Sequence, residues 1–163
     1  MCSPEAFLSF VKFSVIWYTT KVMEQKKIII KNEQETRDFG RKLGREAKAG
    51  SIIALIGDLG TGKTALTKSI AEGLDVTDII TSPTFNIVKE YESGRLPLYH
   101  FDVYRVGDVD EMFELGYEEY FFGQGVCVIE WADLIEEIIP EEAMVIRIFY
   151  GEKEGERIYQ CTC

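Results

Sequence analysis

The chain has 163 residues, which is enough for one domain with a hydrophobic core and too few for two. Its 46% hydrophobic content is ordinary for a globular protein, while 28 acidic and 18 basic residues give a formal net charge of −10. A domain that grips nucleic acid by itself is normally basic, so any nucleic acid is expected to be held mainly by a partner. Four cysteines without a C-x-x-C pair and a single histidine exclude a zinc site of normal spacing.

The first 22 residues are predicted to be an extension of the domain. Residues 7–18 are apolar and aromatic, but Lys12 interrupts them and the run is too short to span a bilayer. A secretory signal would need a basic start and a small-residue cleavage site, and neither is visible. We expect a cytoplasmic protein without a membrane segment, in which residues 1–22 are dispensable and residues 23–163 form a single domain. The alternative for residues 1–22 is an added helix that packs on this domain.

A short strand and an amphipathic helix are predicted to open the domain. Three isoleucines within residues 27–31 indicate the strand, and Asn32 followed by Glu35 is the pattern of a capping box. Gly50 is expected to end the helix in a left-handed conformation. The helix carries one apolar stripe at i, i+4 and i+8, which consists of Phe39, Leu43 and Ala47.

The remaining elements predict an α/β domain. A continuous apolar run over residues 51–56 is typical of a strand buried on both faces, and a helix is expected from Lys63 to about Leu74. Residues 126–129 form another short apolar run. Two hairpins are predicted, one from segments 85–91 and 96–103 and one from segments 144–150 and 157–161. The expected sheet is mixed, parallel at its centre and antiparallel at its edges.

The glycine-rich turn after the buried strand carries the strongest signal. Residues 57–64 read GDLGTGKT and match the P-loop pattern G-x-x-x-x-G-K-[ST] between a strand and a helix. The glycines let backbone N–H groups face phosphate oxygens, and the helix N-terminus adds partial positive charge. We expect Lys63 to bind the β- and γ-phosphates and Thr64 to bind Mg²⁺. The residues expected to bind ATP are Gly57, Asp58, Leu59, Gly60, Thr61, Gly62, Lys63, Thr64 and Ala65.

A P-loop also needs an acid at the end of a neighbouring strand to hold the metal and its water. Glu130 ends the run Val-Cys-Val-Ile, and Asp102 ends the run Leu-Tyr-His-Phe. Each is otherwise a solvated strand-end carboxylate. Two acids divide the work naturally, one for the metal and one for orienting the attacking water. The candidate catalytic residues are therefore Lys63, Asp102 and Glu130.

Three further features have two interpretations each. The segment Ser82-Pro83-Thr84-Phe85 is either a switch that senses the γ-phosphate or a loop that enters a strand. His100 is more typical of a satisfied strand histidine than of a catalyst. Residues 108–142 contain twelve acidic residues and no Lys or Arg, which indicates either a solvated surface or a docking face for a basic partner.

Five motifs in order give the chain a specific resemblance. GDLGTGKT, TSPTF, YHFDVYR, ELGYEEYF and VCVIEW resemble the TsaE family (formerly YjeE), a bacterial ATPase family that assists formation of threonylcarbamoyladenosine on tRNA. The resemblance covers about residues 23–157. It implies a P-loop NTPase-like fold of three layers and weak intrinsic ATP hydrolysis. It also implies action through the TsaB and TsaD proteins, with tRNA contacted only through that complex and TsaD performing the transfer.

The resemblance also implies roles for individual residues. Thr64 and Glu130 are expected to hold Mg²⁺, Asp102 to be a second essential acid, and residues 82–85 to behave as a switch-like loop. The chain departs from the family pattern at two positions: Ala65 stands where many relatives have threonine, and Ala132 where they often have proline. Neither departure touches the lysine or the metal ligands.

Two other functions compete with this interpretation. A small-molecule P-loop kinase would bring arginines over the transferred phosphate, and only Arg95, Arg105 and Arg147 are candidates. A non-catalytic switch would bind ATP only to change its affinity for a partner. A GTPase is disfavoured because no N-K-x-D motif follows the P-loop.

Overall fold

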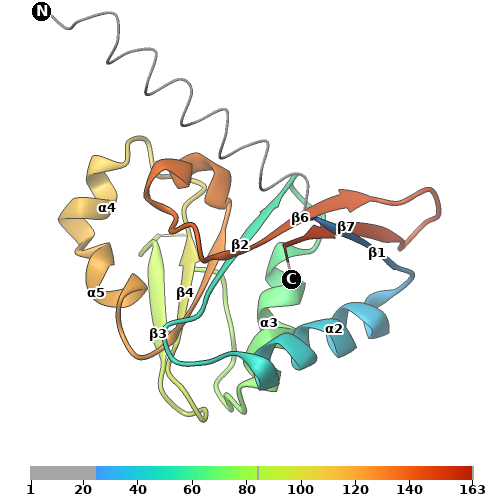
Figure 1. Ribbon diagram of the computed structural model, residues 1–163, viewed down its shortest axis with the longest axis horizontal. Helices are drawn as coiled ribbons and strands as arrows, with labels where there is room; N and C mark the ends of the chain where they lie inside the picture. Colours follow the sequence, from blue (N-terminus) through green and yellow to red (C-terminus); the bar gives the residue numbers. More distant parts are fainter. Residues whose placement is uncertain (1–24, 84, 163) are drawn as a thin grey trace, which may run out of the picture.

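The computed structural model describes residues 25–83 and 85–162 (Figure 1). The predicted extension at residues 1–22 and the predicted switch residue Thr84 lie outside these ranges, so both stay predictions. Within the described ranges no helix is long and apolar enough to cross a membrane.

Seven strands in the described part of the chain form one mixed sheet in the order β1-β7-β6-β2-β5-β4-β3. The four central strands β6, β2, β5 and β4 run parallel, while β1, β7 and β3 join antiparallel at the two sides. The predicted parallel centre and hairpin edges are confirmed. The strands are β1 (Lys26–Ile30), β2 (Ile52–Gly57), β3 (Val88–Tyr91), β4 (Leu98–Asp102), β5 (Val126–Glu130), β6 (Met144–Tyr150) and β7 (Arg157–Cys161).

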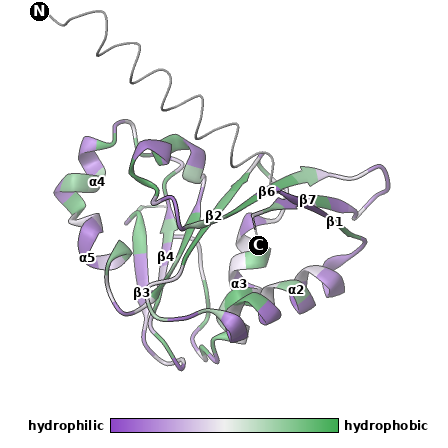
Figure 2. Cartoon of the chain, in the orientation of Figure 1, coloured by the Kyte–Doolittle hydropathy of each residue, from purple (hydrophilic) through white to green (hydrophobic). Residues whose placement is uncertain are grey.

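Helices cover both faces of the sheet and complete the predicted three layers (Figure 1). Successive side chains of a strand point to opposite faces, so β2 supplies Ile53 and Leu55 to one core and Ile52 and Ala54 to the other. The first core packs against α2 (Glu33–Glu46) and α3 (Lys63–Gly73). The second packs against α4 (Asp110–Leu115), α5 (Tyr117–Phe121) and the 3-10 helix η1 (Ala132–Ile138). In Figure 2, β2 is hydrophobic, whereas the β6–β7 loop is hydrophilic.

Helix α2 begins as predicted and ends earlier than predicted. The side chain of Asn32 accepts a hydrogen bond of 3.0 Å from the amide of Glu35 and caps the helix. The last helical residue is Glu46, four positions before Gly50. The guanidinium of Arg95 explains this end, because its Nη2 donates to the carbonyl oxygens of Gly44 (2.5 Å), Arg45 (3.1 Å) and Ala47 (2.6 Å). Gly50 has the predicted left-handed conformation, with a φ of 83°, but it lies beyond the helix, and a long-range side chain supplies the cap.

The short helices α4, α5 and η1 were not predicted. Each has at most seven residues, and none has a side-chain hydrogen bond at its N-cap. Strand β3 also begins three residues later than the predicted segment 85–91. Residues 85–87 instead form a turn, in which the amides of Asn86 and Ile87 donate to the carbonyl of Pro83 and Ile87 has a φ of 63°.

Two glycines let α2 and α3 approach closely. Gly40 and Gly44 lie one turn apart on α2 and face Ser69, Ile70 and Gly73 of α3. A Cβ at position 44 would collide with the carbonyl oxygen of Ile70 and would lie 2.7 Å from the Cα of Gly73. Backbone atoms cannot move aside as flexible side chains do. The distance between α2 and α3 therefore depends on the absence of a side chain at Gly44.

Substituting Gly44→Ala tests this close approach. Alanine is the better helix former by about 1 kcal/mol, so a loosely packed helix would gain stability. We expect the free energy of unfolding to fall by about 1–3 kcal/mol instead, because the added methyl group overpacks the backbone of α3. Urea denaturation followed by circular dichroism measures the change, and Lys42→Ala on the exposed side of α2 is the control. A raised denaturation midpoint for Gly44→Ala would contradict the close packing.

Candidate functional site

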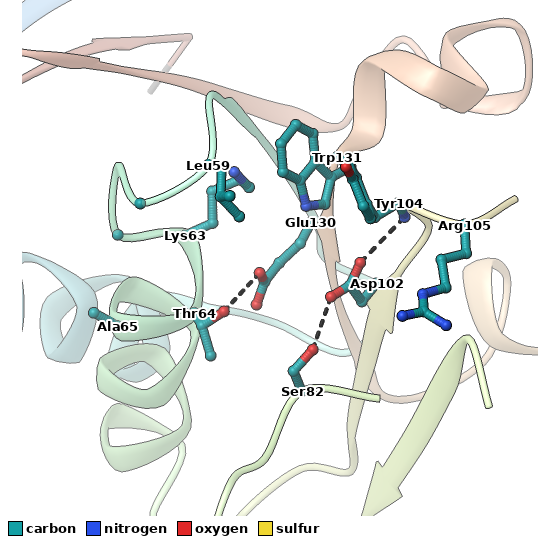
Figure 3. Close-up of a pocket in the computed structure, with 12 residues that line it drawn as sticks. Leu59, Lys63, Thr64, Ala65, Ser82, Asp102, Tyr104, Arg105, Glu130 and Trp131 are labelled. Atoms are coloured by element: carbon teal, nitrogen blue, oxygen red, sulfur yellow. Dashed lines mark hydrogen bonds between the residues drawn. The ribbon is translucent and has the colours of Figure 1, made fainter. Parts of the chain in front are cut away.

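The topology brings the predicted site residues to one edge of the sheet. Strand β2 ends at Gly57, the P-loop follows, and α3 begins at Lys63 behind Gly62, which has a φ of 102°. The parallel strands β4 and β5 end at the same edge, where Asp102 and Glu130 are paired in register. A cavity of about 430 Å³ lies at this edge, between the P-loop and the ends of β4 and β5 (Figure 3). Its lining consists of Leu59, Gly60, Gly62, Lys63, Thr64, Ala65, Ser82, Asp102, Tyr104, Arg105, Glu130 and Trp131.

Lys63 is folded back onto its own loop. Its Nζ donates to the carbonyl oxygens of Gly57 (2.6 Å) and Asp58 (3.0 Å) and lies 3.6 Å from the ring centroid of Trp131. Burial lowers the pKa of the Lys63 ammonium, while the charge of Glu130 acts in the opposite direction. The loop carbonyls and the indole face thus hold a buried ammonium in place, and no carboxylate of residues 25–83 or 85–162 forms a direct ion pair with it.

Glu130 is a buried carboxylate with three side-chain partners. Only 2% of the residue is exposed, and ionised carboxylates at such depth need hydrogen-bond donors. Its Oε2 accepts from the hydroxyl of Thr64 at 2.8 Å. Its Oε1 lies 3.0 Å from the hydroxyl of Thr67 and 2.8 Å from Nε2 of His100. Helix α3 and strand β4 therefore fix the carboxylate of β5 from two directions.

His100 lies in β4, as the sequence favoured, but only one of its ring nitrogens has a hydrogen-bond partner among the described residues. The residue is fully buried, and its Nε2 contacts Glu130. Its other ring nitrogen, Nδ1, has no hydrogen-bond partner among the described residues. The contact with Glu130 makes His100 a neighbour of the candidate site, although it does not line the cavity.

Asp102 has a different environment from Glu130. Its Oδ2 accepts from the hydroxyl of Ser82 at 2.7 Å, and its Oδ1 accepts from the amide of Tyr104 at 3.1 Å (Figure 3). The carboxylate thereby connects the segment that enters β3 with the end of β4. One acid faces α3 and the other faces the predicted switch segment, so the two acids have distinct structural neighbours.

The predicted switch segment is only partly joined to the cavity. Ser82 lines the cavity and Pro83 is buried. The ring of Phe85 is 86% exposed, and the guanidinium of Arg105 lies 5.1 Å from its centroid. Phe85 does not line the cavity and is connected to it only through this contact with Arg105, which does.

Trp131 adopts a backbone conformation that is rare for a large side chain. Its φ of 62° and ψ of 35° are left-handed, which costs of order 1–3 kcal/mol outside glycine. The conformation turns the chain sharply after Glu130, and the indole packs on Tyr104 with centroids 4.7 Å apart. The indole is thereby held over Lys63.

The remaining predicted residues lie around the cavity rather than in it. Gly57, Asp58 and Thr61 do not line it: the first two supply carbonyls to Lys63, and buried Thr61 donates from its hydroxyl to Asp58 O at 2.8 Å. Of the three arginines considered for a kinase, only Arg105 lines the cavity. Sequence reasoning missed Thr67, although its position three residues after Thr64 on α3 is a helical-face signal.

The oxygen donors of the site could hold a magnesium ion that arrives with a nucleotide. Among residues 25–83 and 85–162, no group of three or more His, Cys, Asp and Glu side chains could hold a metal ion alone. The Thr64 hydroxyl and the Glu130 carboxylate are hard oxygen ligands 2.8 Å apart. Mg²⁺ is usually held by one or two such ligands together with phosphates and water, so the residues present fit this ion.

Comparisons with known proteins point to one family. The family model described as threonylcarbamoyl adenosine biosynthesis protein TsaE matches residues 30–158. The tRNA threonylcarbamoyladenosine biosynthesis protein TsaE of Bacillus subtilis (strain 168) is 52% identical over 126 residues, 77% of this chain and 78% of that protein. The protein of the same name from Treponema pallidum is 40% identical over 120 residues, 74% and 88% of the two chains. The crystal structure of Bacillus subtilis YdiB superposes with a TM-score of 0.71 at 44% identity and covers 84% of each chain.

Substituting Thr67→Val tests the support of Glu130. The hydroxyl of Thr67 shares its proton between Lys63 O and Glu130 Oε1, both at 3.0 Å. We expect the free energy of unfolding to fall by about 1–3 kcal/mol, because a buried carboxylate loses a donor. Thermal unfolding measures the change. Ser69→Ala on the same helix is the matched control, because the Ser69 hydroxyl donates only to Ala65 O, at 2.9 Å, within the described part of the chain. Equal losses in the two variants would show that the carboxylate contact adds nothing.

Proposed function

Because the chain belongs to the TsaE family of threonylcarbamoyl adenosine biosynthesis proteins, we propose that it is a magnesium-dependent ATPase that supports this tRNA modification. As a member of this family, the chain takes part in the biosynthesis of threonylcarbamoyladenosine. Our proposal adds that the chain works in the cytoplasm and hydrolyses ATP slowly alone. It also adds that TsaB and TsaD are its partners and that tRNA is contacted only through their complex.

The convergence of four side chains in one cavity is the observation that best supports ATP hydrolysis. Lys63 and Thr64 come from the P-loop, while Asp102 and Glu130 come from two adjacent parallel strands. This combination supplies a cation for phosphates, a hydroxyl for the metal and two acids, which are the parts that phosphoryl transfer to water requires. Residues 57–65 are proposed to bind the triphosphate.

Lys63 has to change partners when ATP binds. In the structure its ammonium is bound by the carbonyls of Gly57 and Asp58 beneath Trp131. We propose that the ammonium moves from these carbonyls to the β- and γ-phosphates, while Thr64 and Glu130 hold magnesium. Magnesium supplies positive charge that neutralises the charge developing on the transferred phosphate.

Asp102 is proposed to position the attacking water or to couple hydrolysis to the switch segment. Its carboxylate is held by the Ser82 hydroxyl and the Tyr104 amide rather than by the P-loop. A shift of residues 82–85 would therefore move the Ser82 hydroxyl, one of the two donors to the Asp102 carboxylate. A kinase is less well supported, because one arginine at the cavity is few for a site that transfers phosphate to a second substrate.

The acidic stretch is proposed to contribute to partner contacts. Residues 108–142 contain α4, α5 and η1, which bury Met112, Tyr117 and Ile135 in the second core. The same stretch leaves Phe113 and Phe122 exposed among its carboxylates. A surface that combines negative charge with exposed aromatic rings suits a basic protein partner.

Variants of the site residues separate binding from hydrolysis. We expect Lys63→Ala to remove most of the affinity for ATP, because the phosphates lose their main side-chain cation. Glu130→Ala and Asp102→Ala should keep the fold but lower the hydrolysis rate by about 100-fold or more. Calorimetric titration with Mg-ATP and release of inorganic phosphate measure the two effects, with Lys68→Ala on the exposed side of α3 as control. Normal ATP binding by Lys63→Ala would overturn the P-loop assignment.

Hydrolysis by the purified chain, alone and then with TsaB, TsaD and tRNA, tests the proposed function as a whole. We expect slow release of phosphate alone and faster release with the partners, because a partner that covers the cavity would exclude bulk water and strengthen the electrostatic interactions within it. ATP binding without turnover under either condition would support the non-catalytic switch. Transfer of phosphate to an acceptor other than water would support the kinase.

A further inference from the structure

The β6–β7 hairpin reaches the outer side of the P-loop. Strand β6 runs parallel to β2, and Gly57 at the end of β2 is in register with Ile148. Strand β6 continues to Tyr150, two residues further, and Tyr150 is paired across the hairpin with Arg157 of β7. This pair therefore stands next to the glycine-rich turn rather than beside the rest of β2.

Both side chains of the pair bind carbonyl oxygens of the P-loop. The hydroxyl of Tyr150 donates to Leu59 O at 2.9 Å. The guanidinium of Arg157 donates from Nε to Thr61 O at 2.9 Å, and its Nη2 lies 3.5 Å from Gly60 O. Three consecutive carbonyls of the turn thus face one hairpin, which is far from the turn in the sequence.

The pair is itself held together. The guanidinium carbon of Arg157 lies 4.7 Å from the ring centroid of Tyr150, so the cation stacks on the ring that carries the hydroxyl. Gly60, with a φ of 80°, lies against this ring, and a Cβ there would be 2.9 Å from the Tyr150 hydroxyl. The second glycine of the motif therefore leaves room for the tyrosine as well as for the turn.

Holding the carbonyls on one side orients the amides on the other. A peptide unit is planar and trans, so its C=O and N–H point in opposite directions. When the carbonyls of Leu59 and Thr61 point to the hairpin, the N–H groups of the same peptide units, those of Gly60 and Gly62, point away from it. The amide between them, that of Thr61, closes the turn by donating to Asp58 O at 3.2 Å. Inward N–H groups are what a P-loop uses to bind phosphate oxygens.

We propose that Tyr150 and Arg157 are positioning residues that hold the P-loop in its phosphate-binding conformation. This inference rests on the proposed ATP binding and concerns the shape of the same site. Neither residue lines the cavity, so neither is a catalytic residue. Their effect passes through the carbonyls of Leu59, Gly60 and Thr61.

Calorimetric titration of the full chain with Mg-ADP and Mg-ATP tests the proposal. We expect Tyr150→Phe, which removes one hydroxyl, to raise the dissociation constant about 3- to 10-fold. Arg157→Lys keeps the positive charge but removes the planar guanidinium that binds two carbonyls, and Arg157→Ala removes both the charge and the guanidinium. We expect losses of about 10-fold for the lysine variant and about 100-fold for the alanine variant. KM for ATP should rise in parallel, with little change in kcat.

Matched variants on the same two strands serve as controls. Tyr159→Phe removes a hydroxyl on β7 that contacts Thr36 at 3.2 Å. Arg147→Lys makes the same exchange on β6 at a position in register with Ile56, before the glycine-rich turn begins. Both controls should bind nucleotide as the unchanged chain does. Unfolding temperatures without nucleotide should be equal for Tyr150→Phe and the unchanged chain.

The outcomes separate this inference from the proposed function. Weaker binding by Tyr150→Phe and Arg157→Lys, with unchanged unfolding temperature, supports positioning by the hairpin. Unaltered affinity in these variants overturns it, and so does a loss that follows a lower unfolding temperature, since the hairpin would then only stabilise the fold. Failure of the unchanged chain to bind either nucleotide would instead overturn the proposed ATP binding.

Discussion

The buried carboxylate of Glu130 connects the sheet to the helix that follows the P-loop. A carboxyl group that is 2% exposed needs hydrogen-bond partners. Here they are the hydroxyls of Thr64 and Thr67 of α3, which donate to it, and Nε2 of His100 of β4. The same contacts set the distance between the P-loop threonine and the strand-end acid. The stability of the fold and the geometry of the proposed metal site therefore depend on one set of hydrogen bonds.

Parallel strand order explains why residues far apart in the sequence share this site. Strands β2, β4, β5 and β6 all end at the edge where the P-loop lies, so β4 and β5 deliver acids to the cavity while β6 delivers Tyr150 to the back of the loop. The antiparallel return of β7 adds Arg157 beside Tyr150. A sheet with parallel strands at its centre can thus supply the inner and outer sides of one loop from separate segments.

Local patterns predicted much of this molecule, and long-range contacts account for what they missed. The apolar run of β2, the glycine spacing of the P-loop and the acids that end β4 and β5 are local signals, and the structure gathers these residues at one cavity. The end of α2 depends on Arg95, which lies 48 to 51 positions after the residues whose carbonyls it binds. The roles of Tyr150 and Arg157 become visible only in the folded structure, because no sequence spacing reveals a hydrogen bond to a distant carbonyl.

The folded-back position of Lys63 has a consequence for nucleotide exchange. Its ammonium has two carbonyl partners and an indole face in the structure, so departure of a nucleotide does not leave a buried cation without partners. If the loop binds ATP as proposed, a resting arrangement of this kind lowers the free-energy penalty for emptying the loop and reduces the affinity for nucleotide by the same amount. We therefore expect the chain to release its product without a dedicated exchange factor.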